Sequence, residues 1–440
     1  MQHLRRFIWM YLVLFACIIA WTISPVRAQA RDSYKNCYYY NAISTRQKNI
    51  YKKAWASPGD ISFQVSGRDY SLADVRTGMM AFMLDFPECE YQEMHINMSS
   101  RSAELDAGIY DEDNETEDPV IYSVDFKKSA TRDENAINNA VNALSAKVSA
   151  YARKHKDERD VLKNIHDTVC KYLTYASLES ATLYDAAINK KTQCGGYAKL
   201  FNVLCRKNGF QSVMVFGKVP GYHAWNMVRL SDGDWYVVDC CFDDTNPYMD
   251  ISHEYFLKGS SDVPERSVLL DKTLLINSET VFYEDLSEIF PAASRYGYAN
   301  VGEEYIDDSG KGKYLIKNYT DVWLVEMNNP GKVVKIPSKV KISGKSYQVT
   351  GLDEGCFIGE DRIEKITYAG RNRTGNFVIG SEAFRDCKRL KVINLKKAGR
   401  ITKVGKNAIT GCPKLKKIAT EKIAKKYRKY ITVKAGRKEK

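Results

Sequence analysis

The chain has 440 residues, of which 44% are hydrophobic and 12% aromatic, a composition that is typical of a globular protein and excludes a disordered chain. Its length exceeds that of one typical domain, so we expect two or three domains. The net charge of +12 is uneven, because residues 301–440 hold 33 Lys and Arg against 15 Asp and Glu, while residues 1–300 carry a net charge of −6. Solvated surface lysines are the simpler interpretation of the basic part, and binding of an anionic ligand is the alternative.

The first 30 residues have the pattern of a secretory signal peptide. Arg5 and Arg6 precede an apolar run over residues 7–23, and an Ala-Gln-Ala cleavage site ends at Ala30. The run is close in length to a membrane span, so an uncleaved anchor is the alternative. We expect cleavage and a secreted or cell-surface protein, which argues against a nucleic-acid partner.

Residues 31–135 form an N-terminal α/β region to which the sequence assigns no role. Strand-like runs at 61–65 and 120–124 flank an acidic, turn-rich stretch at 111–118, which we expect to be a surface loop. From residue 134 the apolar residues recur at helical spacing and predict two helices. In the second helix His166 and Asp167 are adjacent, and adjacent helical residues do not face each other, so we interpret this pair as structural.

A third helix is predicted to begin at or just after Cys194. Tyr197, Phe201 and Leu204 recur at helical spacing, and Gly209 is a plausible C-terminal cap. The free amides and the positive dipole end of a helix N-terminus favour a thiolate and can stabilise an oxyanion. The two glycines after Cys194 fit either a close approach of substrate or a plain turn.

Three strands follow, at residues 210–216, 222–230 and 235–240, and the last two are joined through Ser231-Asp232-Gly233. A two-residue turn would place Asp239 on the face opposite His223. A three-residue loop with Gly233 in the left-handed conformation pairs residue 225 with residue 239 and places Asp239 diagonal to His223 on the same face. We therefore predict the three-residue loop.

Residues 349–418 contain an internal repeat. Residues 355–357 with Ile366 return as residues 382–384 with Ile393, and then as residues 407–409 with Ile418. A period of this size is typical of stacked supersecondary units that bury a shared core, with the lysine-rich end of the chain as a cap.

Cys194, His223 and Asp239 together supply the groups of a thiol-based acyl-transfer site. A cysteine attacks as the thiolate, which needs an imidazole beside it, and the imidazole needs a third group to orient it. The order Cys, His, Asp over 46 residues provides the three roles. A buried structural cysteine and a strand histidine are the alternatives.

Residues from about 160 to 260 resemble the bacterial transglutaminase-like superfamily, whose fold is related to papain-like cysteine peptidases. The residues that carry the resemblance are Ile-His-Asp at 165–167, Tyr175, Tyr-Asp-Ala at 184–186, Cys-Gly-Gly-Tyr-Ala at 194–198, His-Ala-Trp-Asn at 223–226, Trp-Tyr-Val-Val-Asp at 235–239 and Tyr-Phe-Leu at 255–257. The resemblance implies that Cys194 is the nucleophile, His223 the general base and acid, and Asp239 the residue that orients His223. The chain departs from the usual Thr-Trp pair after the acid, where it has Cys240 and Cys241. The C-terminal repeat resembles the leucine-rich repeats of bacterial surface antigens, which implies surface or ligand binding.

We therefore expect an α+β fold, in which a helix bearing the cysteine packs on an antiparallel sheet bearing the histidine and aspartate, followed by a β-rich segment and a short leucine-rich-repeat solenoid. The expected divisions are 1–30 signal peptide, 31–135 N-terminal region, 136–290 catalytic domain, 291–348 β-rich linker and 349–440 repeats with a basic cap.

Ten cysteines remain after removal of Cys17 with the signal, and export makes disulfides possible. If Cys194 is a free nucleophile, the other nine cannot all pair with one another, so at least one further thiol stays free. No cysteine or histidine pair has zinc-site spacing, and we expect no metal and no cofactor. The Cys240-Cys241 pair is interpreted as strand packing, and Asp243, Asp244 and Asp250 as solvated turn acids rather than a calcium site.

The expected function is an exported cysteine-dependent acyl-transfer enzyme acting on protein or peptide amide bonds. Release of the thioester by water gives a peptidase or amidase, and release by an amine gives a transglutaminase; the sequence leaves both open. If the basic repeats are more than a solvated lysine surface, the partners they suit are anionic cell-envelope polymers or host surface proteins. The alternative is a non-catalytic adhesion protein that uses a papain-like scaffold.

Overall fold

The computed structural model describes residues 34–431 except residues 58, 88, 90, 100–119, 129–132, 178–180, 220, 245–249, 265–272, 277–278 and 283–289. The predicted signal peptide and the acidic stretch at 111–118 therefore lie outside the described residues. The chain divides into two compact units, Met1–Ser252 with Glu265–Ala293 and His253–Pro264 with Ser294–Lys440. Of the helices that the structure describes, none has both the length and the apolar character needed to cross a membrane.

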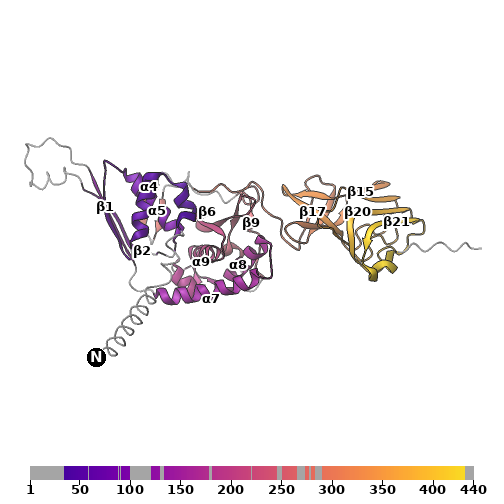
Figure 1. Ribbon diagram of the computed structural model, residues 1–440, viewed down its shortest axis with the longest axis horizontal. Coiled ribbons are helices and arrows are strands. Elements are labelled where there is room, and N and C mark those ends of the chain that lie inside the picture. The colour runs from indigo at the N-terminus through magenta and orange to yellow at the C-terminus, as the bar shows by residue number, and fades with distance from the viewer. Residues whose placement is uncertain are drawn as a thin grey trace, which may run out of the picture. The chain divides into compact units, whose positions relative to one another are not determined.

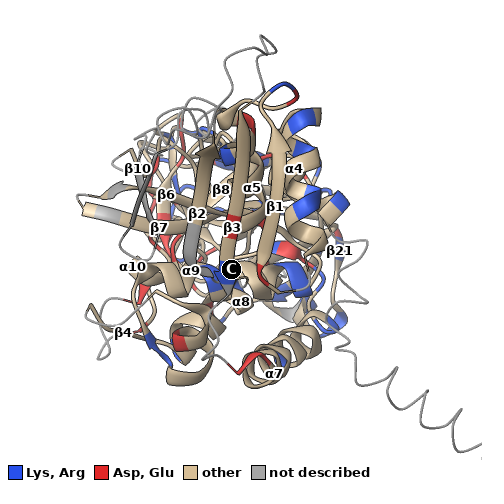
Figure 2. Cartoon of the chain, turned by 90° about the vertical axis from the view of Figure 1, so that its left-hand side faces the viewer, with Lys and Arg blue, Asp and Glu red and all other residues tan. Residues whose placement is uncertain are grey.

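The N-terminal part of the first unit combines helices with an antiparallel sheet in the order β1-β3-β2 (Figure 1). The helices α4 and α5 each begin with a capping box, from Ser44 and Ser71 respectively. Basic residues recur along α4, which carries several blue segments in Figure 2. Of these residues, Arg46, Lys52 and Lys53 are exposed. The elements are the 3₁₀ helix η1 (Tyr34–Asn36), α3 (Tyr38–Ala42), α4 (Thr45–Ala56), β1 (Ile61–Ser66), α5 (Leu72–Asp85), β2 (Tyr91–Ser99) and β3 (Ile121–Lys128).

A buried carboxyl group, Asp85, fixes this N-terminal part. Asp85 accepts hydrogen bonds from the amides of Tyr39 (3.2 Å) and Tyr40 (2.9 Å) and from the hydroxyl of Tyr51 (2.9 Å). Burial raises the pKa of Asp85 to about 7, although these donors and Arg206 act to lower it. Arg206 in turn donates to the carbonyl of Asp85 (2.7 Å), which joins residues 34–85 to the next part of the same unit.

The remainder of the first unit has helices packed on the antiparallel sheet β6-β7-β8. The two predicted helices are confirmed as α7 and α8, and α9 packs against α8 and against β6 and β7 (Figure 1). The elements are α7 (Glu134–Ala152), α8 (Glu158–Tyr172), β4 (Thr174–Tyr175), the π-helix η2 (Asp185–Asn189), β5 (Lys191–Thr192), α9 (Cys194–Lys207), β6 (Gln211–Val219), β7 (Gly221–Arg229), β8 (Trp235–Val238), α10 (Cys240–Asp243), β10 (Thr273–Ile276) and β11 (Glu279–Phe282).

The connection between β7 and β8 is the predicted three-residue loop. Arg229 pairs with Trp235, and the amide of Leu230 donates to the carbonyl of Asp234 (3.1 Å). Gly233 has φ +90°, the left-handed value that the loop requires. Continued along the hairpin, this register places residue 239 opposite residue 225 and diagonal to His223, as the sequence predicts.

The second unit is a mixed β-structure in which β12–β21 belong to one sheet. The predicted boundary between residues 348 and 349 lies inside β17, and strands on both sides of it share one hydrophobic core. The strands are β9 (Phe256–Lys258), β12 (Glu304–Ile306), β13 (Gly312–Ile316), β14 (Asp321–Met327), β15 (Val333–Pro337), β16 (Lys339–Ile342), β17 (Lys345–Leu352), β18 (Lys365–Ala369), β19 (Asn376–Ile379), β20 (Val392–Val404) and β21 (Lys417–Ile423), followed by the 3₁₀ helix η4 (Lys425–Ile431).

The internal repeat appears as stacked parallel strands. Ile366 pairs with Ile393, and Ile393 pairs with Ile418, so the equivalent positions of three repeats lie side by side. Val334 of β15 extends the row beside Ile366, although the sequence analysis did not include it in the repeat. The rings of the equivalent residues Phe357 and Phe384 stack with their centroids 5.8 Å apart. Each repeat therefore covers the apolar side chains of the next.

Truncation of the central isoleucine tests this packing. We expect Ile393→Ala to lower the free energy of unfolding of the second unit by about 2–5 kcal/mol, because Ile393 is fully buried between the equivalent isoleucines of the two flanking repeats. Urea unfolding followed by circular dichroism measures the change. The control is Val333→Ala, since Val333 is 53% exposed. An equal and small loss in both variants would contradict the stacked core.

Candidate functional site

The three residues singled out in the sequence meet in the first unit. Cys194 is the first residue of α9, His223 lies in β7, and Asp239 directly follows β8. The Nε2 atom of His223 lies 2.7 Å from Oδ2 of Asp239, and Cys194 is near enough to His223 to raise the pKa of the imidazole. Cys194 also packs beside a small apolar cluster of Ala198, Met214 and Ala224. Because Asp239 occupies Nε2, Nδ1 is the nitrogen available to the thiol.

The carboxylate of Asp239 is held from both sides. Its Oδ1 atom accepts hydrogen bonds from the amides of Cys241 and Phe242, both at 3.0 Å, so Asp239 is the N-cap of α10. Its Oδ2 atom faces His223, and the side chain is 1% exposed. The predicted strand at 235–240 is too long: β8 ends at Val238, because the Asp239 cap starts a helical turn there.

This helical turn also corrects the prediction for the neighbouring cysteines. Cys240 and Cys241 lie in the first turn of α10 rather than on opposite faces of a strand, and both are buried. Burial raises the pKa of both thiols. Consecutive helical residues can both face the interior when a short helix is covered on several sides, whereas strand residues alternate.

The environment of His223 favours its protonated form. Burial by itself would lower the pKa of His223, but the hydrogen bonds and negative charge supplied by Asp239 and Cys194 outweigh it and raise the pKa to about 9. Phe242 packs edge-on against the imidazole with 4.6 Å between ring centroids, and Trp225 is stacked at 6.0 Å. These rings restrict the orientation of the imidazole and shield its contact with Asp239 from water.

The glycines after Cys194 are required by packing within the chain. A Cβ atom at Gly196 would overlap the Thr192 side chain, and one at Gly195 would lie 2.8 Å from the Cβ of Ala181. The alternative in which substrate approaches these glycines is therefore not needed to explain them. The main-chain amides of Cys194 and Gly195 belong to the first turn of α9, whose amides have no acceptor within the helix.

Two further residues belong to motifs that the sequence analysis quoted. The side-chain Nδ2 of Asn226 donates to the carbonyl of Ala198 (3.1 Å) and so ties β7 to α9 from a fully buried position. Tyr175 of β4 is 50% exposed, and burial first, then the charges of Cys241 and Cys194, raise its pKa. The contact of Asn226 with α9 is tertiary and has no local signal in the sequence.

A second buried polar cluster lies on α8 and α10. His166 contacts Asp167 through Nδ1 (3.0 Å) and Asp243 through Nε2 (3.1 Å). The expectation that His166 and Asp167 do not face each other is wrong, because their side chains are in contact; the interpretation of the pair as structural stays a prediction. Asp243 is not a solvated turn acid either, since it is 3% exposed and faces α8. Burial opposes protonation of His166, yet Cys170 and the two carboxyl groups raise its pKa well above the usual value.

Comparisons with known proteins identify one domain of the chain. Residues 144–240 match the model of the transglutaminase-like superfamily, so the chain contains a transglutaminase-like domain within an α+β fold. A segment of 134 residues is 29% identical to kyphoscoliosis peptidase of Mus musculus, and this segment covers 26% of the chain and 20% of that relative.

Solved structures give similarities of limited extent. The crystal structure of a TGase is 18% identical with a TM-score of 0.24, over 31% of this chain and 45% of that chain. A leucine-rich cell surface protein from Faecalibacterium prausnitzii is 17% identical with a TM-score of 0.24, over 28% of this chain and 33% of that chain. This chain therefore spans less than half the length of each of these relatives.

Replacement of Asp239 by asparagine tests the electrostatics of the site. Asparagine can still cap α10, but it has no negative charge with which to stabilise the protonated imidazole. We expect the pKa of His223 to fall from about 9 toward 6.5, as measured by NMR titration of the imidazole. In the wild type, the interaction of protonated His223 with Asp239 makes its whole contribution to the free energy of unfolding below about pH 6.5. This contribution is lost as the pH rises through about 9. Asp243→Asn is the control, and equal shifts of His223 in both variants would contradict the assignment.

A pair of glycine substitutions tests the start of α9. We expect Gly196→Ala to lower the free energy of unfolding of the first unit by about 1–3 kcal/mol, because the added methyl group would collide with Thr192. Gly221→Ala is the control, since nothing lies within 4 Å of a Cβ atom there. Urea unfolding measures both, and a tolerated Gly196→Ala would show that α9 does not begin as described.

Proposed function

We propose that the chain is an exported cysteine-dependent acyl-transfer enzyme that acts on protein or peptide amide bonds. The observation that carries the proposal is the arrangement of His223, held by Asp239 on one side and next to the Cys194 thiol at a helix N-terminus on the other. The transglutaminase-like match over residues 144–240 supports the same reaction class. In this proposal Cys194 is the nucleophile, His223 the general base and acid, and Asp239 the orienting residue.

The acylation step uses the imidazole twice. The Cys194 thiol gives its proton to Nδ1 of His223, and Sγ attacks the carbonyl carbon of the amide. His223 then donates that proton to the nitrogen of the leaving amine, the C–N bond breaks, and a thioester remains on Cys194. Asp239 keeps Nε2 protonated and stabilises the imidazolium that forms between the two transfers, which agrees with the raised pKa of His223.

The negative charge on the carbonyl oxygen needs hydrogen-bond donors. The amides of Cys194 and Gly195 lie in the first turn of a helix of 14 residues, where the macrodipole also favours negative charge. We assign the oxyanion position to this helix start. The Gln193 side chain does not serve there in this geometry, because its Nε2 donates to the carbonyl of Ser177 (3.0 Å).

The second half of the reaction decides the product. His223 removes a proton from water or from a primary amine, the oxygen or nitrogen attacks the thioester carbonyl, and Sγ leaves and is reprotonated. Water gives hydrolysis, as in a peptidase or amidase, and an amine gives a new amide, as in a transglutaminase.

The rest of the chain supports a role outside the cytoplasm. The pattern of residues 1–30 agrees with secretion, and the basic second unit is suited to binding anionic envelope polymers or acidic surface proteins. We propose that the repeats tether or target the catalytic unit.

Substrate profiling of the full chain beside Cys194→Ala tests the proposal. Both proteins are incubated with a cell-surface protein extract, with and without a labelled primary amine, and mass spectrometry records new termini and amine incorporation. We expect products only with Cys194 present: new termini for a peptidase, and amine-modified glutamine side chains for a transglutaminase.

The matched control is Cys241→Ala, which removes a neighbouring buried thiol but keeps the three proposed catalytic residues. If neither cleavage nor amine incorporation depends on Cys194, the acyl-transfer proposal fails and the non-catalytic binding scaffold takes its place.

A further inference from the structure

A second pair of thiols lies away from the proposed catalytic cysteine, and we propose that Cys170 and Cys240 form a disulfide bond that fastens α10 to α8. This inference does not depend on catalysis by Cys194. It concerns a modification site for thiol–disulfide exchange, whose reaction partner is a small-molecule disulfide.

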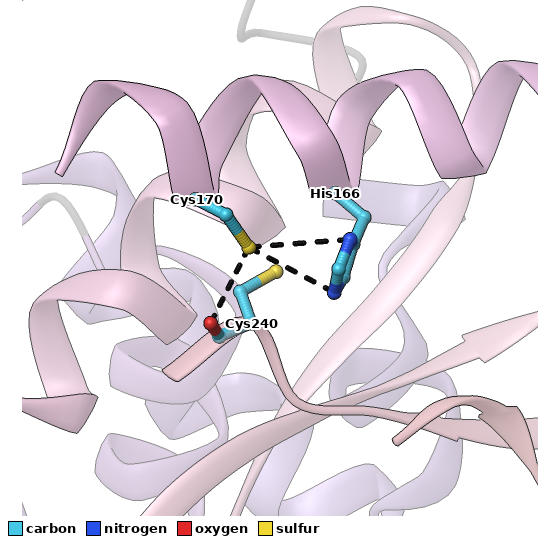
Figure 3. A group of neighbouring side chains, drawn as sticks. All are labelled: His166, Cys170 and Cys240. Atoms are coloured by element: carbon cyan, nitrogen blue, oxygen red, sulfur yellow. Dashed lines mark hydrogen bonds between the residues drawn. The ribbon is translucent and has the colours of Figure 1, made fainter. Parts of the chain in front are cut away.

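The two cysteines are close and share a buried environment (Figure 3). Cys170 lies on α8, and Cys240 is the first residue of α10. The Cys170 thiol is within 3.4 Å of the carbonyl oxygen of Cys240, and the two sulfur atoms lie within 4.8 Å of each other. A disulfide bond needs the sulfurs about 2.05 Å apart, so the remaining approach is a few ångströms at most and starts with rotation of the two side chains. Both residues are 2% exposed in the folded chain.

The same cluster could be considered for a soft metal ion, because a ring nitrogen of His166 also lies within 4.8 Å of both sulfurs. The contacts of His166 argue against this ligand. Its Nδ1 and Nε2 atoms face the carboxyl groups of Asp167 and Asp243 at 3.0 and 3.1 Å, so neither nitrogen presents a lone pair to an ion. Two sulfurs without the imidazole are too few ligands for a structural zinc site.

The surroundings give the two thiols different pKa values. The pKa of Cys170 is lowered to about 7, first by the side chain of Cys240 and then by the charge of His166, whose Nε2 lies 3.8 Å from Cys170 Sγ. Burial raises the pKa of Cys240. His166 lies one turn from Cys170 on α8 and stays beside it before α10 closes, so Cys170 is suited to be the attacking thiolate and Cys240 the resolving thiol.

The exchange balances with one equivalent of a small-molecule disulfide such as oxidised glutathione. The Cys170 thiolate attacks one sulfur of this disulfide, which forms a mixed disulfide and releases one glutathione thiolate. Cys240 then loses its proton and attacks the Cys170 sulfur, which forms the Cys170–Cys240 bond and releases the second glutathione. Because both residues are buried in the folded chain, exchange takes place during folding, before α10 closes on α8.

The position of Cys240 connects this bond to the proposed catalytic site. Cys240 directly follows Asp239, and the next two amides of α10 hold the Asp239 carboxylate. A disulfide across a separation of 70 residues restricts the unfolded chain and anchors the first turn of α10. We expect the oxidised first unit to melt roughly 5–15 °C above the reduced one.

A non-reducing peptide map tests the proposal. The full chain is refolded in glutathione buffers from reducing to oxidising ratios, alkylated after denaturation, digested and analysed by mass spectrometry. We expect a Cys170–Cys240 linked peptide pair that appears with oxidation and disappears on reduction. It should be lost in Cys240→Ser and kept in Cys241→Ser, the adjacent control.

Three results would overturn the proposal: alkylated thiols at both positions under every buffer, a link between Cys170 or Cys240 and another cysteine, or one zinc ion per chain that is lost in Cys170→Ser. If Cys240→Ser does not refold, the wild-type peptide map and its reversal by reductant decide the question. Failure here leaves the Cys194 chemistry unaffected, because substrate profiling compares the wild type with Cys194→Ala and does not depend on a Cys170–Cys240 bond.

Discussion

The carboxylate of Asp239 is the group on which the candidate site depends. One oxygen caps α10 through two amides, and the other orients the His223 imidazole at 2.7 Å. An isolated carboxylate would be costly to bury, but this one is compensated by hydrogen bonds on both sides. A change in the position of α10 would therefore move the imidazole, and with it the partner of the Cys194 thiol.

The position of Cys194 is determined by the packing of α9. Gly195 and Gly196 let α9 begin against Ala181 and Thr192, and Asn226 ties the next turn of that helix to β7. The thiol is thus fixed relative to the strand that carries His223. Both sides of the site are determined by close main-chain contacts, which suits a reaction that needs a defined geometry between nucleophile and base.

Much of this arrangement follows from local sequence. The helical spacing after Cys194 predicts α9, and Gly233 predicts the loop that sets the register of Asp239. The row of Ile366, Ile393 and Ile418 follows from the repeat. The helical turn at Cys240 and the contact of His166 with Asp243 could not be predicted, because the first depends on a cap and the second joins residues 77 apart. The packing of the N-terminal part through Asp85 likewise has no local signal.

Activation of the Cys194 thiol by His223 is measured by the rate at which iodoacetamide alkylates Cys194 near pH 7, in the wild type and in His223→Ala. We predict that Cys194 reacts faster than the other cysteines in the wild type and at least tenfold more slowly without the imidazole, with Asp239→Asn between the two. Peptide mass spectrometry assigns each rate to its residue. Equal rates for Cys194 in the wild type and His223→Ala would show that the imidazole does not activate the thiol.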